Sequence, residues 1–207
     1  MLVLASKSPR RHQLLTLAGV PFRSLPSHVG EHLIKGEKPE AFTRRAARNK
    51  ADAVAKRVQP GTWILSADTT VVVDHEILGK PADQSDATRM LKLLSGREHR
   101  VLTAVVLLKA GSKSADEHLS ETLVTFRTLD ETMISGYLKT GESRDKAGAY
   151  GIQGKGALLV SSIEGSYTNV VGLPLVETSE MIRQVGLWSP FSEVQENKEI
   201  NRENYSD

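Results

Sequence analysis

A short apolar segment at the N-terminus runs directly into a strong helix start. Residues 2–5 are all apolar, as expected for a strand that is buried on both faces. Ser8 then offers the side-chain oxygen that a helix N-cap needs, and Pro9 suits the first helical position. A buried strand followed at once by a helix predicts an α/β fold, in which ligands bind at the carboxyl ends of strands.

Two arginines lie on the first turn of this helix, which is expected over 9–18. The unpaired N–H groups of a helix N-terminus attract anions, and the guanidinium groups of Arg10 and Arg11 match phosphate oxygens. We therefore predict a phosphate site at the end of the first strand. An ordinary capped helix with two solvated arginines explains the same segment.

Strand and helix patterns alternate along the rest of the chain. Further strands are expected over 22–25, 63–67, 70–73, 99–109, 117–126 and 157–163, and further helices over 39–56, 85–94, 130–139 and 173–185. The two long strand patterns are separated by a polar segment, which predicts an antiparallel hairpin. We divide the chain into one domain over 1–187 and a polar tail over 188–207, which we expect to be disordered.

Composition excludes several classes of protein. The chain has 207 residues and no cysteine, which removes thiol nucleophiles, thiolate metal sites and disulfides. A net charge of +2 does not indicate a nucleic-acid binder, and no apolar run approaches the ~18 residues of a membrane span. We expect a cytoplasmic protein that binds neither nucleic acid nor membrane.

Two charged residues lie next to apolar strand patterns. Asp68 comes directly after the segment 63–67, so we place its carboxylate at the carboxyl end of that strand, between two strands. A carboxylate there suits a hard divalent cation or a proton taken from water, although an aspartate that caps a turn is the simpler alternative. Lys80 lies in a rigid turn between Gly79 and Pro81, and a surface lysine is its alternative.

The segment 146–156 contains four glycines, which allow backbone to approach a ligand closely. Tyr150 and Gln153 within it are able to contact a nucleotide base, whereas a flexible connector is the plain alternative. His28 and His32 have the spacing of metal ligands on a helix, but Gly30 between them favours a loop. A carboxylate, several cations and a base-reading loop together indicate a metal-assisted phosphoanhydride hydrolase.

Five segments in order resemble the Maf family of nucleoside triphosphate pyrophosphatases: 6–11, 67–69, 79–81, 146–154 and 171–175. The resemblance extends from residue 2 to about residue 187. It implies an elongated α/β fold, similar to that of inosine triphosphatases, with a mixed central sheet flanked by helices and two lobes around a deep cleft. It also implies a homodimer that hydrolyses a nucleoside triphosphate between the α and β phosphates with Mg²⁺ or Mn²⁺.

The resemblance assigns roles to individual residues. Asp68 matches the catalytic carboxylate that accepts a proton and binds the metal, and Glu31 matches a second acidic residue near the metal. The positions expected to bind phosphate are Ser8, Arg11, Lys50 and Lys80.

Three further positions, Arg10, Thr69 and Gln153, resemble the branch of the family that prefers dTTP and UTP. A glutamine amide both donates to and accepts from a neutral pyrimidine edge, in agreement with this preference. Modified pyrimidine nucleotides are possible substrates as well. The alternatives are a 7-methyl-GTP pyrophosphatase and a nucleotide-binding regulator of cell division whose hydrolysis is incidental.

Overall fold

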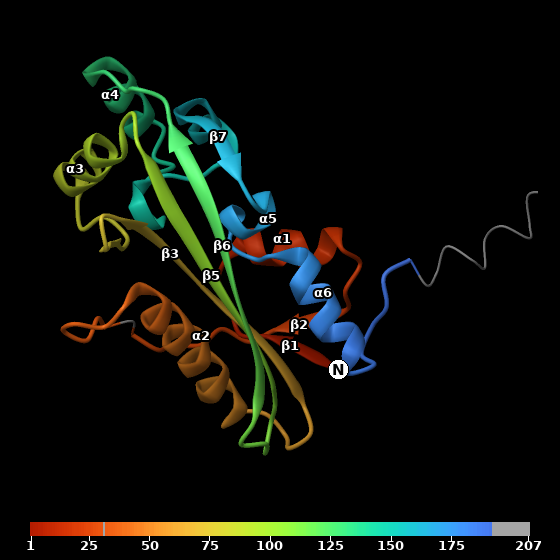
Figure 1. The fold of residues 1–207 in the computed structure, drawn as a ribbon. Helices are drawn as coiled ribbons and strands as arrows, with labels where there is room; N and C mark the ends of the chain where they lie inside the picture. The colour runs from red at the N-terminus through yellow and green to blue at the C-terminus, as the bar shows by residue number, and fades with distance from the viewer. Residues whose placement is uncertain (31, 192–207) are drawn as a thin grey trace, which may run out of the picture.

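The computed structural model describes residues 1–30 and 32–191. Its centre is a mixed sheet of seven strands in the order β2-β1-β3-β5-β6-β7, with β4 paired to β3 (Figure 1). The strands are β1 (Leu2–Leu4), β2 (Phe22–Ser24), β3 (Trp63–Val73), β4 (Glu76–Leu78), β5 (Glu98–Lys109), β6 (Ala115–Phe126) and β7 (Val160–Glu164). Only β1 pairs in parallel, with β2 and β3, and the other pairs are antiparallel. The expected mixed α/β fold is confirmed.

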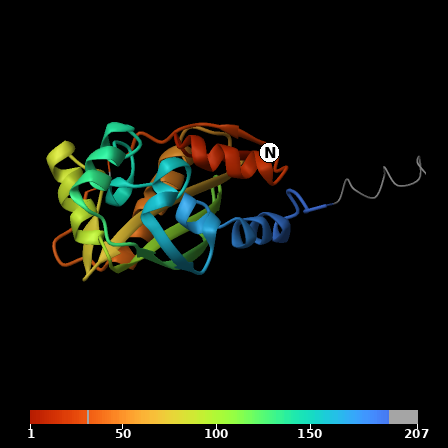
Figure 2. The same ribbon diagram turned by 90° about the horizontal axis from the view of Figure 1, so that it is seen from above.

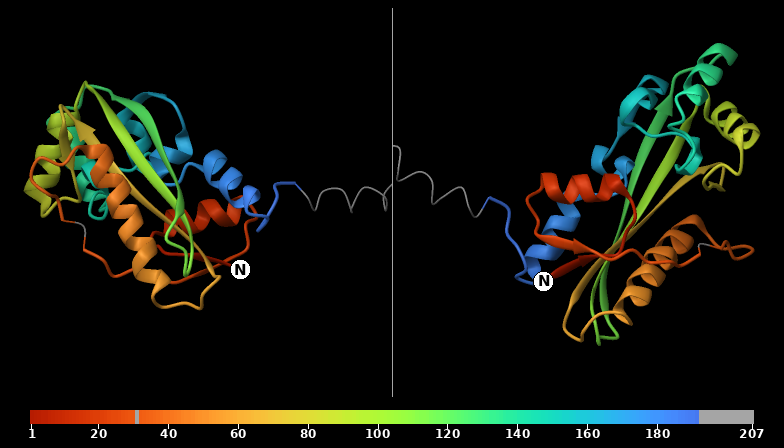
Figure 3. Two further views of the ribbon diagram at one scale, coloured as in Figure 1. Left: turned by 60° about the horizontal axis from the view of Figure 1, so that its bottom comes forward. Right: turned by 180° about the vertical axis from the view of Figure 1, so that it is seen from behind.

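Helices cover both faces of this sheet. They are α1 (Pro9–Leu17), α2 (Pro39–Ala55), α3 (Gln84–Leu94), α4 (Glu131–Lys139), α5 (Tyr167–Val171) and α6 (Leu175–Gln184), with 3₁₀ segments η1 (Ala147–Ala149) and η2 (Gly154–Leu159). Helix α2 packs on one face, and α1, α5 and α6 pack on the opposite face (Figure 3).

Two lobes share the long strands β3, β5 and β6. In one lobe, Leu91 and Leu94 of α3 pack with Phe126 and with the far ends of these strands. In the other lobe, Leu15 of α1 and Ile182 of α6 pack on the opposite ends of β3 and β5. Seen from above, α3 and α4 therefore lie at one end of an elongated molecule and α6 lies at the other (Figure 2).

The structure corrects two expectations about strands. The predicted break at 68–69 is wrong, because β3 is one strand of 11 residues that pairs with β5 continuously from Trp63 to Val72. Asp68 therefore lies in the middle of a strand rather than at its end. The strand expected over 157–163 begins only at Val160, because 154–159 forms a 3₁₀ segment. The β5–β6 hairpin and the helix capped by Asp130 are confirmed.

Near the end of the described chain, Leu187 and Trp188 pack against the lobe that contains α1 and α6. From residue 192 on, the tail expected over 188–207 lies outside the described residues, and the domain boundary at 187 stays a prediction. Among residues 1–30 and 32–191, no helix is both long and apolar enough to cross a membrane.

Candidate active site

A cleft of about 920 Å³ opens along β3, at the edge of this strand that faces away from β5. On this side of β3, β1 pairs with 63–65 and β4 pairs with 71–73, so the described strands leave 66–70 uncovered. Because β1 ends at Leu4 and the chain then turns into α1, the N-terminus of that helix meets the middle of β3. The cleft is lined by every expected site residue that the structure describes: Ser8, Arg10, Arg11, Lys50, Asp68, Thr69, Lys80 and Gln153.

Asp68 faces α2 because side chains alternate along a strand. Ser66, two positions before Asp68 on β3, also reaches this helix, because its Oγ donates to the Ala47 carbonyl at 2.7 Å. From α2, Lys50 Nζ donates to Asp68 Oδ1 at 2.5 Å, and Asp68 is only 4% exposed. A short charge-assisted bond in a buried position fixes the orientation of this carboxylate.

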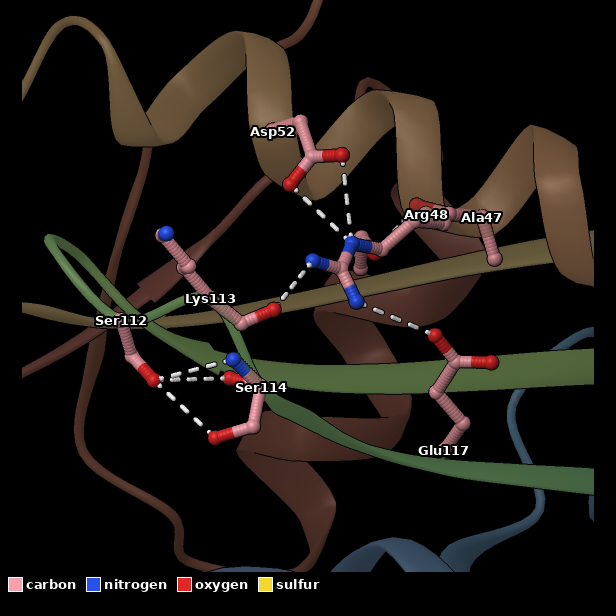
Figure 4. Close-up of polar contacts among 8 residues, drawn as sticks. Ala47, Arg48, Asp52, Ser112, Lys113, Ser114 and Glu117 are labelled. Atoms are coloured by element: carbon pink, nitrogen blue, oxygen red, sulfur yellow. Dashed lines mark hydrogen bonds and ion pairs between the residues drawn. The ribbon is translucent and has the colours of Figure 1, made fainter.

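Arg48 bonds helix α2 to the β5–β6 hairpin (Figure 4). Its guanidinium group donates to the Lys113 carbonyl at 3.1 Å and to Glu117 at 3.4 Å, both in the β5–β6 hairpin. It also contacts Asp52 at 3.1 Å, one turn further along α2. These bonds hold the helix against the hairpin, and Lys50 belongs to the turn that they hold.

The start of α1 has the capping geometry that the sequence predicts. Ser8 Oγ accepts from the Arg11 amide at 3.4 Å, and Pro9 occupies the first helical position. Arg10 is half-buried at the cleft wall, where its guanidinium group lies 3.5 Å from the Asp145 carboxylate. The N-terminus of α1 therefore adjoins a cationic side chain inside the cleft, as an anion site requires.

Arg11 turns away from solvent, and the alternative of two solvated arginines is wrong for this residue. Only 9% of Arg11 is exposed. Its Nε donates to the Gly172 carbonyl at 2.7 Å and its Nη2 donates to Thr69 Oγ1 at 2.9 Å. Arg11 thereby joins α1, β3 and the end of α5, and it brings a buried positive charge to the cleft.

The glycine-rich segment is an ordered wall of the cleft, so a flexible connector does not describe it. Glu142 accepts from the amides of Lys155 and Gly156, each at 3.2 Å, and so holds the start of η2 next to Gln153. The Gly148 amide donates to the Gly79 carbonyl at 3.1 Å, which joins this segment to the Lys80 turn. Gln153 and Lys80 consequently line the same cleft.

Tyr150 lines the cleft but is only 5% exposed, and its role as a base contact stays a prediction. Its hydroxyl lies in the core, 2.7 Å from His99 Nε2, and its ring packs edge-on against Phe126 at 4.6 Å. Burial lowers the pKa of His99 to about 4, so this imidazole is neutral at pH 7. Sequence reasoning missed His99, because nothing in its local pattern distinguishes it from other polar positions in a strand.

One carboxylate suits a divalent cation in this cleft. Mg²⁺ is commonly held by one or two carboxylates together with phosphate oxygens of a substrate, and Asp68 presents such a carboxylate. Glu31, the second expected metal residue, lies outside the described residues. Among the described residues, no three His, Cys, Asp or Glu side chains gather to hold a metal, and this includes His28 and His32 in their loop.

Curated relatives match almost the whole chain. A dTTP/UTP pyrophosphatase of Symbiobacterium thermophilum is 50% identical over 89% of this chain and 94% of the relative. Proteins of the same name from Myxococcus xanthus and Geobacillus are each 47% identical, over 92% and 89% of this chain and 95% and 98% of their own lengths. A family model described as Maf-like protein matches residues 1–185. With its five motifs gathered around one cleft, the chain belongs to the Maf family.

Proposed function

We propose that this protein is a nucleoside triphosphate pyrophosphatase that hydrolyses dTTP and UTP to the monophosphate and pyrophosphate. The main support is the cleft, which combines a buried carboxylate with cations from three separate elements. Its described lining contains six basic side chains, Lys7, Arg10, Arg11, Lys50, Lys80 and Lys146, against the acidic Asp68 and Asp145. This excess of positive charge complements a triphosphate. The names of the relatives support the choice of substrate.

In this proposal Asp68 accepts a proton from the water that attacks the α phosphorus. Lys50 holds the carboxylate in place through its bond to Oδ1. Ser8, Arg11 and Lys80 bind phosphate oxygens and stabilise the charge that develops on the leaving pyrophosphate. Mg²⁺ or Mn²⁺, held by Asp68 and Glu31, would supply further compensation of phosphate charge when bound.

Base selection is assigned to Arg10, Thr69 and Gln153, which lie around the same cleft. A neutral amide at position 153 is able to pair with the donor and acceptor edge of uracil or thymine. Modified pyrimidine triphosphates that keep this edge are further proposed substrates. A homodimer stays a prediction from the family resemblance, and a cytoplasmic location stays a prediction from composition.

The test is pyrophosphate release from a panel of normal, 5-modified and 7-methylated triphosphates, with and without Mg²⁺ or Mn²⁺. Asp68→Asn should abolish turnover, and dTTP should still bind in calorimetry. Asp74→Asn is the matched control, because Asp74 lies just beyond the same strand, outside the lining of the cleft. Its left-handed φ of 47° also suits asparagine. Near-normal pyrophosphate release from Asp68→Asn would refute the assignment, and a preference for 7-methyl-GTP would favour the alternative branch.

A further inference from the structure

Thr103 lies beneath the cleft without lining it. It sits on β5 directly opposite Thr69 of β3, and the two hydroxyl oxygens are 3.0 Å apart. Thr103 is 0% exposed, whereas Thr69 reaches the cleft wall. The pair connects a cleft residue to a hydroxyl that no ligand in the cleft is able to touch.

The direction of each hydrogen bond follows from the neighbours of this pair. Thr103 Oγ1 donates its single hydrogen to the Asn169 carbonyl at 3.1 Å, so toward Thr69 it acts as an acceptor. Thr69 therefore donates to Thr103, in preference to the Gly172 carbonyl at the longer distance of 3.5 Å. The oxygen of Thr69 in turn accepts from Arg11 Nη2 at 2.9 Å. These three hydrogen bonds form a relay in which Arg11 donates to Thr69, Thr69 donates to Thr103, and Thr103 donates to the Asn169 carbonyl.

Both ends of the relay are bonded to α5 or to the residue that directly follows it. The Asn169 side-chain amide donates to the Val101 carbonyl at 3.0 Å and to Thr122 Oγ1 at 2.9 Å, which fixes α5 against β5 and β6. At the other end, Arg11 Nε donates to the Gly172 carbonyl, which directly follows α5. The position of the Arg11 guanidinium group thus depends on the Thr69 hydroxyl, which is in turn held by the buried hydroxyl of Thr103.

We propose that Thr103 is a positioning residue for nucleotide binding. By accepting the Thr69 hydrogen, it keeps that hydrogen inside the protein and turns the Thr69 oxygen toward Arg11 and the cleft. The Thr69 hydroxyl is consequently available to a bound nucleotide only as an acceptor, and Arg11 is held in one orientation. This inference rests on the proposed function of the cleft.

Two substitutions separate the hydroxyl of Thr103 from its volume. Thr103→Val keeps the shape and removes the hydroxyl, whereas Thr103→Ser keeps the hydroxyl and leaves a methyl-sized cavity. We expect Thr103→Val to raise the KM for dTTP by about fivefold, the effect of one neutral hydrogen bond, and to change kcat by less than about twofold. Thr103→Ser should restore the KM to within about twofold of the unmodified protein and still lower the thermal midpoint.

Thr178→Val is the control, because Thr178 is equally buried on α6 and its hydroxyl has no hydrogen-bond partner among the described residues. Its KM should not change. The double variant Thr69→Val/Thr103→Val should bind dTTP no more weakly than Thr69→Val alone, since both substitutions break the same relay. A KM that follows the thermal midpoint across these variants, or one that Thr103→Val leaves unchanged, would overturn the proposal.

Calorimetric binding of dTTP in the presence of EDTA gives the same comparison without turnover. A protein that binds dTTP but releases no pyrophosphate would contradict the proposed hydrolysis and leave the relay testable by the Kd. Pyrophosphate release with no effect of Thr103→Val would contradict the relay alone. Absence of both binding and release would overturn both proposals.

Discussion

Replacing Lys50 with methionine removes the cation that contacts Asp68 in the cleft and keeps most of the side-chain length. The Lys50 and Asp68 side chains are only 12% and 6% exposed, and their N–O distance is 2.5 Å. Removing one partner of a buried ion pair costs about 3–5 kcal/mol, whereas an exposed pair contributes ~0–1 kcal/mol. Because the adjoining cleft admits water to Asp68, we expect Lys50→Met to lower the free energy of unfolding by about 2 kcal/mol.

A double-mutant cycle in urea denaturation at pH 7 tests the origin of this loss. An asparagine at position 68 carries no charge, so Lys50→Met should cost at least ~1 kcal/mol less in the Asp68→Asn background than in the native sequence. Pyrophosphate release from dTTP should fall roughly 100-fold in Lys50→Met, because the carboxylate loses its fixed orientation. Free energies that add within ~0.3 kcal/mol would refute the reasoning about the pair.

Three other substitutions and conditions give separate expectations. Gln153→Glu should lower kcat/KM for dTTP and UTP by about tenfold or more, because a carboxylate offers a pyrimidine edge no donor; an unchanged preference in a nucleotide panel would count against a base contact. His99 has a pKa of about 4 in the fold against 6.5 in an unfolded chain, so the unfolded state binds the proton more readily. The free energy of unfolding therefore decreases as the pH is lowered. Between pH 7 and pH 5 the loss should be about 2 kcal/mol, and His99→Gln should remove most of it in urea denaturation. Gly148→Ala should destabilise by roughly 1–3 kcal/mol in the same assay, since φ is +67° and a Cβ would lie 3.0 Å from Val71; full stability would show that the segment relaxes freely.

Local patterns in the sequence were sufficient for the elements around the cleft. Ser8 and Pro9 place the start of α1 because capping depends on residues that are adjacent in the chain. The polar connection between the long strands likewise predicts the β5–β6 hairpin. Local patterns and the family resemblance together named the site residues, and the structure brings those that it describes into one cleft.

Local patterns failed where distant pairing decides the structure. Asp68 looked like the end of a strand because polar residues interrupt an apolar run, yet β5 continues to pair with β3 on both sides of it. The local pattern around Tyr150 also gave no sign that its ring packs with Phe126 or that its hydroxyl bonds to His99. The Thr69–Thr103 pair could not be found without the strand register, because its members are 34 positions apart.

The most direct test of the account is the structure of Asp68→Asn with dTTP and Mg²⁺ bound. The account predicts that the triphosphate lies in the cleft, with the α phosphate next to position 68 and other phosphate oxygens on Ser8 and Lys80. The base should contact Gln153. A nucleotide bound outside this cleft, or one whose α phosphate lies away from position 68, would contradict the account.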